Sequence, residues 1–274
     1  MVSGYFQFST SQSDKDTIMV LAIDIGNSNT VIGCIDGGEI SHVFRLSTNI
    51  ARTADEYAVE LGSVLDFHEV PRETIDGAVI SCVVPPLTRV IRTAVKLLTG
   101  IDAIVVGAGL KTGMNILIDD PAQLGGDMVA TAVGALASYK PPIIIVDLGT
   151  ATKMFVLDKK GNFIGGAILP GVAISMNALA ARAAQLPNVP IEAPNKCISA
   201  NTIDCMKSGA IFGAASSIDG MIQRFEAELG DKARIVATGG LSDAVYRYCE
   251  HDVTHDPNLI LRGLSIIYDK NRRK

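Results

Sequence analysis

The chain has 274 residues, a formal net charge of −5 and 48% hydrophobic residues, with only 5% aromatic. This length accommodates two cores of ordinary domain size, and the aliphatic composition is typical of α/β proteins whose strands are buried on both faces. The acidic balance gives no indication of a nucleic-acid partner, and no apolar run reaches membrane-spanning length. Five cysteines without a Cys-x-x-Cys pair argue against a disulfide framework and structural zinc. We therefore expect a cytoplasmic protein that binds neither membranes nor nucleic acids.

The first elements in chain order are predicted to form a β-meander. Residues 1–18 are polar and lack an apolar signal core, so we expect a disordered upstream extension. A buried strand then begins at Met19. Gly37 and Gly38 separate two further apolar runs, which is a strong hairpin signal. The predicted strands of this meander are 19–25, 30–36 and 39–46.

A polar turn between the first two strands is the first candidate phosphate site. It consists of Asp24, Ile25, Gly26, Asn27, Ser28, Asn29 and Thr30. Glycine lets the backbone approach a ligand closely, and the small hydroxyl and amide side chains add hydrogen-bond donors. The aspartate can hold a cation or a metal-bound water. A turn of this kind by itself is more often an ordinary hairpin, so its meaning depends on the rest of the chain.

Helices and strands alternate after the meander, which implies a parallel portion of sheet. Thr53, with Glu56 three residues later, forms a capping-box pattern at a helix start. Gly100 is placed to end the next helix, and Asp127 heads the one after it. The predicted elements beyond the first helix are a strand at 77–84, a helix at 87–98, a strand at 101–106 and a helix at 128–137.

The second half of the chain repeats this plan. An apolar run at 143–146 ends in a second polar turn, which consists of Asp147, Leu148, Gly149, Thr150, Ala151 and Thr152. A later run ends in Thr238, Gly239 and Gly240, a glycine pair suited to lying against a flat nucleoside. The other predicted elements are strands at 153–158 and 163–169 and a helix at 202–228. Two polar turns that face each other would bind the phosphates of a nucleotide from both sides.

Two phosphate-type turns followed by a Thr-Gly-Gly turn resemble the actin-like ATPase superfamily of sugar kinases, Hsp70 and actin. The resemblance implies an α/β fold of two similar ribonuclease H-like domains, with mixed sheets flanked by helices and ATP in the cleft between them. The expected domains are 19–135 and 136–274, bridged by the helix that Asp127 heads.

The motifs are more closely similar to those of the type III pantothenate kinases. Besides the phosphate turns, the residues that carry this similarity are Gly125, Gly126, Asp127, Gly165, Gly166, Pro170 and Gly171. Their order and spacing match from Met19 to about Gly263. The resemblance implies ATP-dependent phosphorylation of the primary hydroxyl of pantothenate, the first step of coenzyme A biosynthesis. Family members are dimers with the substrate pocket near the interface, so we also expect a homodimer.

The resemblance also implies roles for single residues. Asp127 would be the general base, although spacing alone favours a helix N-cap; a weak base suffices for a loose phosphoryl-transfer transition state. Asp24 would orient Mg²⁺, and Asp147 would help to hold a monovalent cation, K⁺ or NH₄⁺. The backbone of both polar turns, with Gly239 and Gly240, would bind ATP. The substrate side would be formed by Ile118, Gly125, Gly126, Met128 and Thr202.

Three positions depart from the family's pattern. Met128 stands where the family has an arginine, Ile118 where a tyrosine is usual, and Lys153 where a threonine follows the second turn. Lys153 has three open interpretations: it accompanies the loss of the substrate-side cation, it relocates that charge toward a phosphate, or it faces solvent. Three functions stay open with them: a pantothenate kinase, a kinase for another small hydroxylated acceptor, and a non-catalytic regulatory protein on the same fold.

Overall fold

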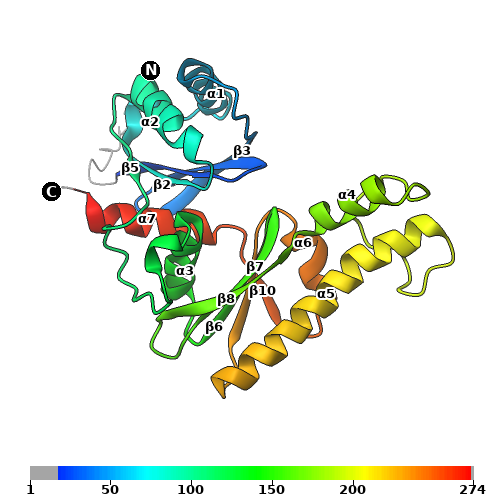
Figure 1. Ribbon diagram of the computed structural model, residues 1–274. Helices are drawn as coiled ribbons and strands as arrows, with labels where there is room; N and C mark the ends of the chain where they lie inside the picture. The colour runs from blue at the N-terminus through cyan, green and yellow to red at the C-terminus, as the bar shows by residue number, and fades with distance from the viewer. Residues whose placement is uncertain (1–17, 273–274) are drawn as a thin grey trace, which may run out of the picture.

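The computed structural model describes residues 18–272 and contains two five-stranded mixed sheets (Figure 1). Residues 1–17 of the expected extension lie outside the described residues. The first sheet has the order β3-β2-β1-β4-β5 and consists of β1 (Met19–Ile25), β2 (Asn29–Asp36), β3 (Glu39–Ser47), β4 (Ile75–Cys82) and β5 (Ile104–Val105). The second has the order β10-β9-β6-β7-β8 and consists of β6 (Ile143–Leu148), β7 (Ala151–Leu157), β8 (Phe163–Pro170), β9 (Arg234–Thr238) and β10 (Val253–His255).

The two sheets follow one plan. β1 pairs antiparallel with β2, which pairs antiparallel with β3, and β1 also pairs parallel with β4. β6 has the same relations to β7, β8 and β9. The expected α/β fold of two similar units with mixed sheets is therefore confirmed.

Helices flank both sheets on the part of the chain that the structure describes. They are α1 (Ala54–Phe67), α2 (Pro85–Thr99), α3 (Gly126–Ser138), α4 (Val172–Arg182), α5 (Thr202–Leu229), α6 (Ser242–Val245) and α7 (Leu259–Asn271), with short 3₁₀ turns at Arg72–Thr74, Pro121–Gln123 and Tyr246–Tyr248. α1 and α2 share a core with the first sheet, and α5 shares one with the second. None of the helices described is both long and apolar enough to cross a membrane.

Local sequence signals account for most of these boundaries. The Thr53 side chain accepts a hydrogen bond from the Glu56 N–H while the Glu56 carboxylate accepts one from the Thr53 N–H, so the predicted capping box is confirmed. Gly100 ends α2 in the left-handed region with φ of 75°, a conformation that glycine adopts without a Cβ penalty. Gly37 and Gly38 both have positive φ in the predicted hairpin.

Some elements differ from the predictions. The strand expected at 101–106 is reduced to the two residues of β5, and α4, β10 and α7 have no predicted counterpart. α7 is the most consequential of these, because its apolar stripe packs on β1 and on α3. In Figure 1, α3 and α7 lie between the two sheets. The predicted domain boundary at residues 135 and 136 falls inside α3 and stays a prediction.

Close backbone contact between α3 and α7 depends on two glycines. A Cβ built on Gly263 would lie 1.7 Å from the Ala130 carbonyl oxygen, and one built on Gly134 would lie 2.0 Å from the Leu259 carbonyl oxygen. No side chain fits between the helices at these points. Because α3 begins beside Asp127, this crossing also sets the position of the proposed base.

We expect Gly263→Ala to destabilise the protein by about 1–3 kcal/mol or more, as overpacking of a tight core does. Gly220→Ala is the matched control, because Gly220 is also helical but its added Cβ would meet only the Arg224 guanidinium at 3.8 Å. The control should gain up to about 1 kcal/mol from the better helix propensity of alanine. Urea unfolding of the three proteins measures both effects, and equal stability of Gly263→Ala and the parent would contradict the close crossing.

Candidate active site

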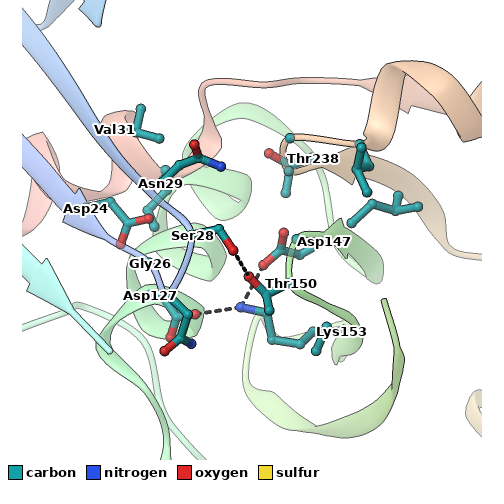
Figure 2. A pocket seen from close by; sticks show the side chains of 18 of the residues that line it. Asp24, Gly26, Ser28, Asn29, Val31, Asp127, Asp147, Thr150, Lys153 and Thr238 are labelled. Carbon is teal, nitrogen blue, oxygen red and sulfur yellow. Dashed lines mark hydrogen bonds and ion pairs between the residues drawn. The ribbon is translucent and has the colours of Figure 1, made fainter. Parts of the chain in front are cut away.

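A cleft of about 600 Å³ lies between the two halves of the molecule, where β1 and β6 end in their polar turns. Figure 2 shows both turns and Asp127 facing one another across it. Eleven of the predicted site residues line the cleft: Asp24, Gly26, Asn27, Ser28, Asn29, Asp127, Asp147, Gly149, Thr150, Gly239 and Gly240. The structure thus brings together the three motifs that lie far apart in the chain.

The two polar turns approach within hydrogen-bond distance. The Ser28 and Thr150 hydroxyl oxygens are 3.2 Å apart across the cleft. Each turn is closed by its own glycine, because the Gly26 N–H donates to the Asn29 carbonyl at 3.0 Å and the Gly149 N–H donates to the Ala151 carbonyl at 3.2 Å. These two N–H groups are therefore engaged inside the turns.

Asp24 sits near the end of β1, and its carboxylate faces an unfavourable environment. Its Oδ1 atom is buried and has no hydrogen-bond partner among residues 18–272. Burial, together with the neighbouring carboxylates of Asp127 and Asp147, raises the pKa of Asp24 to about 7. The described residues contain no group of three or more His, Cys, Asp or Glu side chains that would hold a metal by themselves. A carboxylate oxygen without a hydrogen-bond partner, beside two polar turns, fits Mg²⁺, which usually takes one or two protein carboxylates plus phosphates and water.

Asp127 lies in the first turn of α3, but it is not the N-cap. The N-cap is Gly125, which makes no side-chain cap bond. The carboxylate of Asp127 instead accepts a hydrogen bond at Oδ2 from Lys153 Nζ at 2.6 Å. A Cβ on Gly125 would lie 2.4 Å from Asp127 Oδ1, so glycine at this position leaves the carboxylate its room. The N-cap interpretation is wrong, and the carboxylate is directed at the cleft.

Lys153 bridges two carboxylates. Besides Asp127 it contacts Asp147, with Nζ 2.8 Å from Oδ2, and its side chain is only 19% exposed. Asp147 and Lys153 stand directly opposite each other in the β6–β7 pairing. Burial works against the charge on Lys153, but Asp147 and Asp127 outweigh it and raise the pKa of the ammonium. The interpretation that Lys153 faces solvent is therefore wrong.

Ser242 holds the third turn, Thr238-Gly239-Gly240, in place. Ser242 Oγ donates to the Gly239 carbonyl at 2.6 Å and lies 2.9 Å from His255 Nε2. Gly239 has φ of 95°, and a Cβ there would lie 2.6 Å from Asp147 Oδ1. The Thr-Gly-Gly turn thus packs directly against the carboxylate of the second turn.

The remaining predicted residues do not line the cleft. Thr30 is buried, and its hydroxyl lies 3.0 Å from that of Thr48. Ile118 and Met128, which stand where the family usually has a tyrosine and an arginine, each pack against one apolar cluster of the second half. The other three, Gly125, Gly126 and Thr202, lie outside the cleft lining as well.

Several cleft residues were not predicted, and Arg45 is the most informative. It lies on β3, and its guanidinium would be 3.7 Å from a Cβ on Gly240, so a cation of the first half meets the Thr-Gly-Gly turn of the second. The β2–β3 pairing puts Arg45 opposite Val31, which also lines the cleft. A hairpin register counted from Gly37 and Gly38 alone would set Phe44 opposite Val31, and the register shift between Cys34 and Ile35 is what brings Arg45 there. The other unpredicted lining residues include Val83, Thr131, Ala173, Ile174, Pro257 and Ile260.

Comparison with solved structures defines the fold. The chain resembles component A of (R)-2-hydroxyglutaryl-CoA dehydratase from Acidaminococcus fermentans, with a TM-score of 0.53, 14% identity and coverage of 92% of this chain and 97% of that one. It also resembles the activator of 2-hydroxyisocaproyl-CoA dehydratase from Clostridium difficile with bound ADPNP, with a TM-score of 0.52, 14% identity and coverage of 92% and 94%. At this identity the likeness shows the fold alone, which is that of the actin-like ATPases.

Comparison of sequences defines the family. The family model described as type III pantothenate kinase matches residues 20–224. Proteins named type III pantothenate kinase from Pelobacter propionicus, Roseiflexus castenholzii and an Exiguobacterium species are 41%, 42% and 39% identical to the chain. Each alignment covers 93% of this chain and 100% of the relative. The chain belongs to the type III pantothenate kinase family.

The raised pKa of Asp24 predicts that the stability of the metal-free protein depends on pH. Its pKa in the fold, about 7, lies above the ordinary value of 3.8, so the charged form opposes folding and stability falls as pH rises through this window. At roughly 1.4 kcal/mol per pKa unit, and with a discount for contact with cleft water, Asp24→Asn should gain about 2–4 kcal/mol at pH 8 and little near pH 4. Denaturant unfolding in EDTA at both pH values measures the gain. A gain that does not depend on pH would contradict it.

Proposed function

We propose that this chain transfers the γ-phosphoryl group of ATP to the primary hydroxyl of pantothenate, in the cytoplasm, as the first step of coenzyme A biosynthesis. The observation that carries the proposal is the meeting of two phosphate turns with Asp127 in one cleft. Membership of the type III pantothenate kinase family supports the choice of substrate. Kinase chemistry of this kind needs positioned phosphates, a cation and a correctly placed hydroxyl, and little covalent help.

The nucleotide would span both halves of the cleft. Because Gly26 and Gly149 use their N–H groups within the turns, the phosphate donors would be the N–H groups of Asn27, Ser28 and Thr150 and the two hydroxyls. Gly239 and Gly240 would lie against the nucleoside, with Arg45 beside them. Asp24 would hold Mg²⁺, which when bound supplies charge neutralisation and orients the phosphates.

Asp127 would accept the proton of the attacking hydroxyl. The hydrogen bond from Lys153 Nζ to its Oδ2 holds the carboxylate in position at the cleft. A weak base suffices, because in a loose transition state the hydroxyl becomes acidic only late. The monovalent cation implied for Asp147 does not fit these residues, since Lys153 Nζ already contacts that carboxylate at 2.8 Å. No step of the proposed reaction uses such a cation.

The activity prediction is direct. Protein incubated with ATP, Mg²⁺ and pantothenate should form 4′-phosphopantothenate, detected by mass spectrometry. Asp127→Asn should lower the rate by about 10²-fold or more, the contribution typical of a positioned general base. Asp102→Asn is the control, because Asp102 is an exposed carboxylate paired with Lys96 outside the cleft. It should keep the parental rate.

Other outcomes of this activity assay would favour different functions. ADP release with another small hydroxy acid or polyol, but not with pantothenate, would point to a different acceptor, in keeping with the apolar pair Ile118 and Met128. No turnover with any acceptor would favour the non-catalytic regulatory protein. Equal turnover by the parent and Asp127→Asn would remove Asp127 from the chemistry.

We also propose that the protein is a homodimer formed through β8, α4 and the start of α5. Of thirteen exposed large hydrophobic side chains among the described residues, five lie here and a sixth lies in the loop before α5: Ile164, Ile168, Ile174, Leu179, Ile203 and, in the loop, Ile198. In Figure 1, α4 and the first part of α5 extend away from the second sheet. Thr202 is exposed at the first residue of α5 and outside the cleft of its own chain. A second copy would give it a route to a substrate.

Light scattering at micromolar concentration should give a dimeric mass for the parent. Ile168→Glu should shift it to the monomer, because Ile168 is 73% exposed on the edge strand β8 and a charge buried at an interface is costly. Phe67→Glu is the matched control, since Phe67 is 83% exposed but lies on α1 of the first half. A monomeric parent would refute the dimer, and an equal effect of both substitutions would refute its location.

A further inference from the structure

The position of the Lys153 side chain is not accounted for by the proposed binding of the ATP phosphates or of the acceptor. Its ammonium contacts Asp127 Oδ2 at 2.6 Å and Asp147 Oδ2 at 2.8 Å, and all three side chains are less than 20% exposed. We infer that Lys153 is a tethered monovalent cation: its ammonium occupies the place of a free K⁺ or NH₄⁺ at Asp147 and positions Asp127 at the same time. The inference rests on the proposed kinase function and specifies how the charges of that site are neutralised.

The sheet dictates the placement of this ammonium. β7 is a central strand of the second sheet, and its pairing with β6 sets Lys153 opposite Asp147. The helix start carries Asp127 to the same point from the other side. A lysine at this position therefore reaches both carboxylates without leaving its strand, so the contact follows from the register rather than from a chance side-chain conformation.

One fixed cation matters here because Asp127 and Asp147 lie against the same ammonium. The two carboxylates can bring two negative charges, and Lys153 brings one positive charge between them. Without the lysine, the two carboxylates would face each other with no cation between them, and a bound K⁺ or NH₄⁺ would supply the same single charge. Charges at these separations interact strongly in a partly buried site.

The ammonium also has one N–H donor left for the reaction. A lysine has three N–H donors, and the two carboxylates use two of them. The third remains for a phosphate oxygen or a water molecule. Lys153 is a positioning residue in this scheme, because it acts on the proton transfer through Asp127.

The first experiment needs no activity. Thermal unfolding of the metal-free parent, Lys153→Thr and Lys153→Met is followed in KCl, NH₄Cl and choline chloride at one ionic strength. The parent should show the same melting temperature in all three salts. Lys153→Thr should be stabilised by K⁺ and NH₄⁺ relative to choline, because a vacated cation site with a small oxygen side chain selects small cations. Lys207→Thr should show no selectivity, since Lys207 pairs with Glu192 outside the cleft.

The second experiment measures turnover with ATP, Mg²⁺ and pantothenate in the same salts. The parent should be as active in choline as in K⁺. Lys153→Thr should lose about tenfold or more in kcat in choline, equivalent to about 1.4 kcal/mol in the barrier, and recover part of it in K⁺ or NH₄⁺. KM for ATP should change less than kcat, because the lost contact is to the base. A purely structural lysine would give no cation rescue.

Three results would overturn the inference. They are tenfold activation of the parent by K⁺, a K⁺-selective rise in the parent's melting temperature, and the absence of any cation-selective response in Lys153→Thr. The first two use the parent, so they decide the matter even where the variants do not fold. A parent that never turns over would count against the proposed kinase function, and the melting experiment would still decide the role of Lys153.

Discussion

Repulsion among three carboxylates is the constraint on which this site depends. Asp24, Asp127 and Asp147 converge on one cleft, where burial and their mutual charge raise the pKa of Asp24. Like charges at short range are relieved when one group takes up a proton or when a cation lies between them. The protein supplies one itself, as the Lys153 ammonium, and leaves Asp24 with an unpartnered oxygen. The negative charge is thus partly neutralised around Asp127 and Asp147, whereas among residues 18–272 it has no cation beside it at Asp24, where Mg²⁺ fits.

The duplicated sheet makes this convergence possible. Asp24 and Asp147 hold equivalent positions on equivalent strands, each between an antiparallel and a parallel neighbour. Two copies of one arrangement, turned to face each other, bring two polar turns together from opposite sides. Asp127 belongs to neither sheet. It is carried by α3, which lies between the sheets and is held by the close crossing with α7 at Gly134 and Gly263.

The departures from the family's pattern fall into two physical groups. Ile118 and Met128 stand where the family has polar side chains, and both pack against one apolar cluster. Lys153 lies elsewhere, on the strand facing Asp147, and changes the charge of the reaction centre. The first group lies outside the cleft lining, and the second lies inside it.

The sequence by itself determined the strands that end in polar turns, the capping box at Thr53 and the order of the three motifs, because these follow from local periodicity and turn chemistry. Together with the resemblance to the type III pantothenate kinases, they predicted the α/β fold with its duplicated plan and eleven of the residues that line the cleft. Only the tertiary structure decided which side chains meet. Pattern left Lys153 with three interpretations, and the pairing of β6 with β7 and the approach of α3 decided that it bridges two carboxylates. The same holds for Arg45 and for α7, whose positions depend on strand register and helix packing between residues far apart in the chain, which no local pattern encodes.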